Sequence, residues 1–159
     1  MNDVKLKDEF IIENLIYEIR GKHVMLDSDL ARLYECANGT KSINLAVNRN
    51  NERFPADFYF QLTKEEYNNL KFQIETSNSS NNHGGVRKLP YVFTEQGVAM
   101  LSSTLKTITA SITSINIMRA FVAMRKYINT NLIEQRYINN LLNKLKGVNN
   151  EWYNSKRWY

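Results

Sequence analysis

Cysteine, proline and histidine are scarce in this chain. Its 159 residues include one cysteine, Cys36, and two prolines. A single cysteine excludes an internal disulfide framework and favours a reducing cytoplasm as the compartment. One of the two histidines, His23, has no second ligand at a useful spacing, so we expect an ordinary strand residue there and no metal site.

Long apolar runs and the common catalytic motifs are also missing. No run approaches the roughly 18 apolar residues that cross a membrane, and the first ten residues lack the apolar core of a signal peptide. The sequence contains no His-Glu-x-x-His, Cys-x-x-Cys or Gly-x-Ser-x-Gly motif. Gly84-Gly85 lacks the spacing of a phosphate-binding loop. We therefore expect no membrane contact, no enzyme and no cofactor.

The charge balance points to a polyanionic partner. Lys and Arg number 21 against 16 Asp and Glu, which gives a net charge of +5 and a pI of about 9.3. Such a balance is typical of proteins that bind nucleic acid, but the charge alone does not establish a nucleic-acid partner. A chain of this length buries about two thirds of its unfolded surface, so it can fold without disulfides or a structural metal ion. Its length suits one domain with an appendage.

The stretch from Val24 to Phe54 has the pattern of a helix-turn-helix. Asp27 or Ser28 is expected to cap the first helix, and Asn38-Gly39 should break the chain because both residues tolerate positive φ. Thr40 or Ser42 is expected to cap the second helix. In a helix-turn-helix, this second helix enters the DNA major groove.

The two sides of the second helix differ in chemistry. At about 100° per residue, one side should pack on the first helix, and we give its Asn50 a structural hydrogen bond rather than contact with a base. An amphipathic helix that merely faces water is the alternative, but this face is poor in acid and follows a capped helix and a turn. Lys and Arg neutralise phosphates or pair with guanine, and Asn pairs with adenine. The opposite side carries Lys41, Asn44, Leu45 and Asn48, flanked by Ser42 and Arg49.

The remaining chain alternates short strands and helices. A β-hairpin is expected around Gly21, with Ile19, Val24 and Leu26 facing the core. A strand at 58–62 should precede a helix that starts at the Thr63–Glu66 capping box and ends near Phe72. The later elements are a strand at 89–93, a helix capped by residues 94–96, a helix at 110–129, a weak interruption at 129–131 and a helix at 132–146.

The fold class predicted from these elements is α+β: a winged helix-turn-helix-like domain with short β-hairpins, followed by C-terminal helices. The polar loop at 75–88 ends with Arg87 and Lys88 and is expected to act as a wing, with a solvated linker as the alternative. We expect a DNA-binding domain at 10–128, then a C-terminal helix and a basic aromatic tail at 129–159. That tail either stacks on bases or anchors on the protein surface.

Four segments in the same order resemble the KilA-N superfamily, specifically its phage-type branch named after the N-terminal part of an open reading frame six product. They read IYEIRGKHVMLDSDLARLY, NLAVNRNNERFPADFYFQLTKEE, GGVRKLPYVFTEQGVAMLSS and NIMRAFVAMR. The resemblance implies DNA binding, a phage or prophage origin and a role as regulator or antirepressor. Two departures are the Asn- and Ser-rich stretch before Gly84 and the short segment after Arg125, where relatives often carry an effector domain.

Together these patterns predict a sequence-specific protein for double-stranded DNA that acts as a homodimer through its C-terminal helices. The alternative is a protein-binding module that inactivates a phage or host repressor through the same helices. If the chain binds DNA, we expect Arg53, Arg87 and Lys88 to hold phosphates and the second helix to contact the bases. The predicted contact residues are Lys41, Ser42, Asn44, Asn48, Arg49, Arg53, Arg87 and Lys88.

Overall fold

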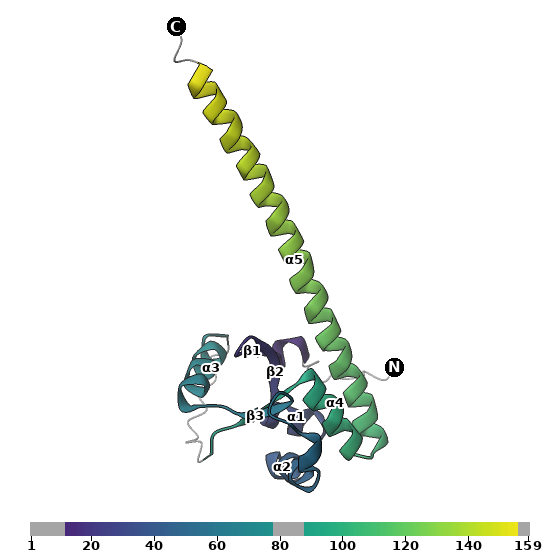
Figure 1. The fold of residues 1–159 in the computed structure, drawn as a ribbon. Helices are drawn as coiled ribbons and strands as arrows, with labels where there is room; N and C mark the ends of the chain where they lie inside the picture. The colour runs from purple at the N-terminus through teal and green to yellow at the C-terminus, as the bar shows by residue number, and fades with distance from the viewer. Residues whose placement is uncertain (1–11, 78–87, 156–159) are drawn as a thin grey trace, which may run out of the picture. The chain divides into compact units, whose positions relative to one another are not determined.

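The structure, a computed structural model, describes residues 12–77 and 88–155 (Figure 1). The chain divides into two compact units, Met1–Phe121 and Val122–Tyr159. The first unit is α+β and is built on a four-stranded antiparallel sheet, which confirms the predicted fold class at that level. The loop expected to form a wing lies mostly outside the described residues, so the wing stays a prediction.

The sheet has the strand order β1-β2-β4-β3. Strands β1 (Tyr17–Ile19) and β2 (Lys22–Leu26) form the hairpin predicted around Gly21. Both turn residues have positive φ, +55° at Arg20 and +70° at Gly21, as a tight two-residue hairpin turn requires. The other two strands are β4 (Tyr91–Thr94), which pairs with β2, and β3 (Tyr59–Gln61), which forms one edge.

Both faces of the sheet are covered. On one face, Val24, Leu26 and Val92 form a buried cluster with Leu62 and with Leu70 of α3 (Lys64–Ser77). Ile19 packs against this cluster, as predicted. Side chains alternate along a strand, so Met25 and Phe93, which are also fully buried, serve the other face. There the sheet meets α1 (Asp27–Leu33) and α4 (Glu95–Thr104).

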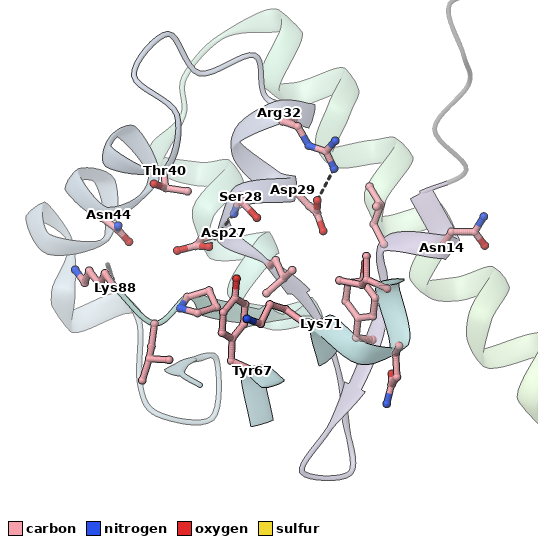
Figure 2. Close-up of a pocket in the computed structure, with 17 residues that line it drawn as sticks. Asn14, Asp27, Ser28, Asp29, Arg32, Thr40, Asn44, Tyr67, Lys71 and Lys88 are labelled. Atoms are coloured by element: carbon pink, nitrogen blue, oxygen red, sulfur yellow. Dashed lines mark hydrogen bonds and ion pairs between the residues drawn. The ribbon is translucent and has the colours of Figure 1, made fainter. Parts of the chain in front are cut away.

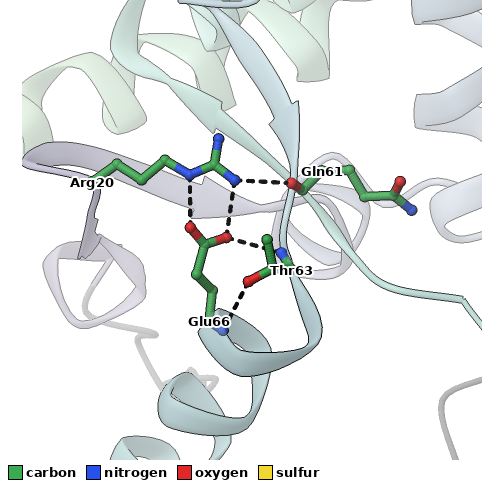
Figure 3. Close-up of polar contacts among 4 residues, drawn as sticks. All are labelled: Arg20, Gln61, Thr63 and Glu66. Atoms are coloured by element: carbon green, nitrogen blue, oxygen red, sulfur yellow. Dashed lines mark hydrogen bonds and ion pairs between the residues drawn. The ribbon is translucent and has the colours of Figure 1, made fainter.

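Helix α3 begins with the capping box expected from the sequence (Figure 3). The Thr63 amide donates to Glu66 Oε2 at 2.9 Å, and the Glu66 amide donates to Thr63 Oγ1 at 3.2 Å. The Arg20 guanidinium pairs with the same carboxylate at 2.7 Å, and this contact holds the pKa of Glu66 below its usual value. The side chain of Arg20 is about half exposed, so the ion pair positions the hairpin more than it stabilises it.

Two predicted helix ends were wrong. Helix α3 continues past Phe72 to Ser77, because Ile74 still packs on the apolar cluster. The expected interruption at 129–131 is helical within α5 (Ile108–Ser155). Asn and Thr are only weak helix formers and do not break a helix as proline does. Here Thr130 Oγ1 donates to the Lys126 carbonyl at 3.0 Å within the helix.

Candidate nucleic-acid interface

Helices α1 and α2 (Thr40–Arg49) pack against each other and are joined by residues 34–39. Leu30 and Ala31 of α1 and Ile43 and Val47 of α2 are buried. Helix α2 also packs on α4, which leaves its other side exposed. The sequence therefore located the helix pair correctly.

The exit from α1 differs from the expected Asn-Gly break. Glu35 takes the left-handed conformation with φ +53°, and the Cys36 amide donates to the Ala31 carbonyl at 2.9 Å. This is the Schellman ending, a motif in which glycine is usual at the position held by Glu35. Asn38 does not have positive φ, whereas Gly39, with φ +58°, leads into α2.

The caps predicted for α1 and α2 were also wrong. The residue before α1 is Leu26, and the one before α2 is Gly39; neither helix has a side-chain cap. The buried carboxylate of Asp27 instead accepts hydrogen bonds from the amides of Ser28 at 2.8 Å and Tyr91 at 3.2 Å. Burial raises the pKa of Asp27 in spite of these bonds. Asp27 thus ties the start of α1 to strand β4.

A cavity of about 1040 Å³ lies beside the helix pair (Figure 2). Asp29 pairs there with Arg32, and burial raises the pKa of Asp29. Asp29 Oδ2 and Asn44 Oδ1 are buried without a hydrogen-bond partner. In the described residues no group of three His, Cys, Asp or Glu side chains could hold a metal ion. Asn44 lines this cavity, but its amide oxygen is buried and does not meet water.

The exposed face of α2 gathers part of the predicted contact set. Lys41, Asn48 and Arg49 are exposed, and helical spacing places Lys41 and Asn48 on the same side of α2, two turns apart. Arg53 is exposed in the short 3-10 helix Asn51–Arg53. These four side chains are free to meet a ligand from solvent.

Four other predicted contacts are placed differently. Ser42 and Asn44 are half-buried. Lys88 is exposed at the cavity, with its ammonium 5.3 Å from the centre of the Tyr91 ring. Arg87 lies outside the described residues. The structure therefore brings together only the contacts on and just after α2.

Asn50, directly after α2, and Leu45 within it have roles that their neighbours explain. Asn50 Nδ2 donates to the Ala46 carbonyl at 2.9 Å, which confirms the structural role predicted for it. Leu45 is 48% exposed between the basic residues of the outer face. Helical spacing predicts Leu45 on that face, but no contact was predicted for it. An apolar residue that lies between cations on an exposed helix face is the sequence signal that could have identified Leu45 as a further contact residue.

The first turns of α5 support the end of α1. Tyr34 and Ser114 are both buried, and their hydroxyl groups lie 2.8 Å apart. Ser114 Oγ also donates to the Ala110 carbonyl at 2.7 Å, and Thr113 Oγ1 donates to the Leu33 carbonyl at 3.4 Å. The position of the helix pair thus depends on a hydrogen bond between residues that are far apart in sequence.

We expect Tyr34→Phe to lower the free energy of unfolding by about 1 kcal/mol, because it removes one buried hydrogen bond and leaves the ring in place. Ser114 keeps its bond to Ala110, so little penalty for an unpaired group is added. Urea unfolding of the variant against wild type measures the difference. Tyr137→Phe is a suitable control because Tyr137 is 65% exposed. Equal losses in the two variants would contradict this role for Tyr34.

The comparisons with known proteins agree with this architecture. The chain carries an N-terminal domain of the KilA-N and antirepressor type. Residues 14–104, more than half of the chain, match the ORF6N domain, and the chain therefore belongs to the ORF6N family. This family is not known for enzymatic activity. No curated protein and no solved structure gives a significant match. None of the described helices is long and apolar enough to cross a membrane.

Proposed function

We propose that this chain is a sequence-specific protein for double-stranded DNA, of phage or prophage type, that acts as a transcriptional regulator or antirepressor. The observation that carries the proposal is the exposed face of α2, where Lys41, Asn48 and Arg49 are free and no acidic residue intervenes within the helix. Membership of the ORF6N family supports the same conclusion. We also propose that the DNA-binding domain ends at residue 128, as the sequence predicts.

Each exposed residue has a role that suits its chemistry. Lys41 and Arg49 pair with guanine or with phosphate, and Asn48 pairs with the adenine edge. Arg53, beyond the end of α2, holds a backbone phosphate together with Arg87 and Lys88. Leu45 sits where it meets a thymine methyl group.

Ser42 and Asn44 take a smaller part in the proposed interface. Ser42 is half-buried, and the Asn44 amide oxygen must turn outward before it reaches a base edge. We therefore expect Lys41, Asn48 and Arg49 to carry most of the base recognition.

A second function is favoured by one observation. The C-terminal part of α5 exposes large apolar residues, among them Tyr137, Leu141 and Leu145. A surface of this kind could bind and inactivate a repressor without any contact with DNA. Dependence on salt distinguishes the two functions, because phosphate contacts weaken steeply as salt rises and an apolar interface does not.

The test is fluorescence anisotropy with a labelled generic duplex at about 50 and 200 mM salt. We expect wild type to bind at the lower salt and to weaken at the higher one. Lys41→Ala/Arg49→Ala should bind about tenfold or more weakly. Lys22→Ala/Lys64→Ala is the matched control: it removes the same charge from exposed positions on β2 and α3, so its affinity should change little.

Two outcomes would contradict the proposal. A folded wild-type protein that fails to bind at low salt would favour the repressor-binding function. Equal losses in the two double variants would mean that net charge, and not the α2 face, determines binding.

A further inference from the structure

The second unit presents an apolar face along its helix. Between Val122 and Val148, large apolar side chains remain 43–67% exposed on one side. Monomeric soluble proteins rarely leave so many large apolar side chains exposed on one side of a helix. The members that share this side are Tyr127, Ile138, Leu141, Leu142 and Leu145.

The spacing on this side is that of a coiled coil. Met124, Ile128, Asn131, Gln135, Ile138, Leu142 and Leu145 alternate steps of four and three residues, which is the heptad spacing of core positions. We call these seven residues the seam. A seam with this period supercoils around a partner of the same kind, so the partner that fits is another helix.

Two polar residues in the seam point to an identical partner. A side-chain amide both donates and accepts hydrogen bonds. Asn131 can therefore pair with its own counterpart across a two-fold axis, and so can Gln135. In an apolar groove of an unrelated protein the same amides would be buried without partners, which is costly.

Register favours parallel over antiparallel pairing. In an antiparallel coiled coil the two alternating core positions lie opposite each other, so the register that pairs Asn131 with Gln135 leaves Leu145 beyond the partner's seam. The register that includes Leu145 puts Asn131 opposite Leu142 and Gln135 opposite Ile138. In the parallel arrangement each seam residue meets its own counterpart, which pairs the amides and keeps all seven seam residues in contact.

We propose that Val122–Val148 forms a parallel two-stranded coiled coil with the same segment of a second copy of this chain. The pairing deepens the proposed function by naming a partner, but it is measured without DNA. Its failure is therefore distinguishable from a failure of DNA binding.

The first test is the molar mass of the full chain, measured by light scattering at roughly tens of micromolar. Wild type should have twice the 18.6 kDa of one chain. Leu142→Asp/Leu145→Asp puts charge into the seam and should return the mass to that of one chain. Asn140→Asp/Asn143→Asp adds the same charge on the other side of the helix and should leave the dimer intact.

The second test is disulfide crosslinking in a Cys36→Ser background. Met124→Cys and Leu145→Cys should each crosslink to its own counterpart on mild oxidation, because parallel helices bring equal positions together. Asn143→Cys, away from the seam, should not crosslink.

Each contrary result overturns the proposal. A wild-type monomer, a mass above that of a dimer, or seam and control double variants of equal mass would exclude this pairing. Crosslinks that form only between Met124→Cys and Leu142→Cys in a mixture would establish the antiparallel arrangement instead.

Discussion

Gly97→Ala is expected to lower the free energy of unfolding by about 3 kcal/mol, at the upper end of the cost of inserting a methyl group into a packed interior. A Cβ atom at Gly97 would lie 2.1 Å from the carbonyl oxygen of Phe58 and 3.0 Å from its carbonyl carbon. That oxygen accepts hydrogen bonds from the Thr94 amide at 3.0 Å and from Thr94 Oγ1 at 3.2 Å. Because backbone stands in the way, α4 and the chain before β3 must separate.

Urea unfolding followed by circular dichroism measures this loss, and Gly147→Ala is the matched control. Gly147 also lies in a helix, but a Cβ there meets nothing within 4 Å. Alanine at that position should leave stability unchanged or raise it by up to about 1 kcal/mol. If Gly97→Ala unfolds at the same urea concentration as wild type, the close approach of Phe58 to α4 is wrong.

Gly97 illustrates which parts of the fold could be predicted from the sequence and which could not. The sequence predicts a cap at residues 94–96, and this is confirmed: the Thr94 side chain accepts from the Gly97 amide at 3.3 Å at the start of α4. The reason for the glycine could not be predicted, because Phe58 lies 39 positions earlier in the chain. The hairpin at Gly21 and the capping box at Thr63 were predictable because each is decided by neighbours a few residues away.

The errors at the two ends of α1 have different physical origins. Asp27 was expected to cap α1, but its carboxylate also accepts from the Tyr91 amide, which the sequence places 64 residues later. The turn was assigned to Asn38-Gly39 because those residues tolerate positive φ most easily. Glu35 takes the left-handed conformation instead, because α1 ends in a Schellman motif in which the Cys36 amide donates to the Ala31 carbonyl.

The candidate site was predictable in outline and not in detail. Helical spacing alone identified the exposed residues Lys41, Asn48 and Arg49 and the inward hydrogen bond of Asn50. It could not place Asn44, because a helical wheel does not include the walls that α1, α3 and residues 88–90 supply around the cavity.

Disrupting the seam is expected to weaken binding to a long duplex by about 100-fold, because a dimer that engages two sites gains from effective concentration. The long duplex is one of about 30 base pairs, which accommodates two half-sites one helical turn apart. Leu142→Asp/Leu145→Asp should show this loss relative to Asn140→Asp/Asn143→Asp. Both variants carry the same added negative charge, so the comparison cancels general repulsion from DNA.

A duplex of about 12 base pairs completes this experiment, since it is too short for two half-sites spaced by one turn. On it, the two double variants should bind with equal affinity, and the salt dependence of wild type should be shallower than on the long duplex because fewer phosphates are neutralised. If the seam variant equals the control on the long duplex as well, each copy binds DNA independently. Dimerisation would then not assist DNA binding, and the repressor-binding function would become the better account of the second unit.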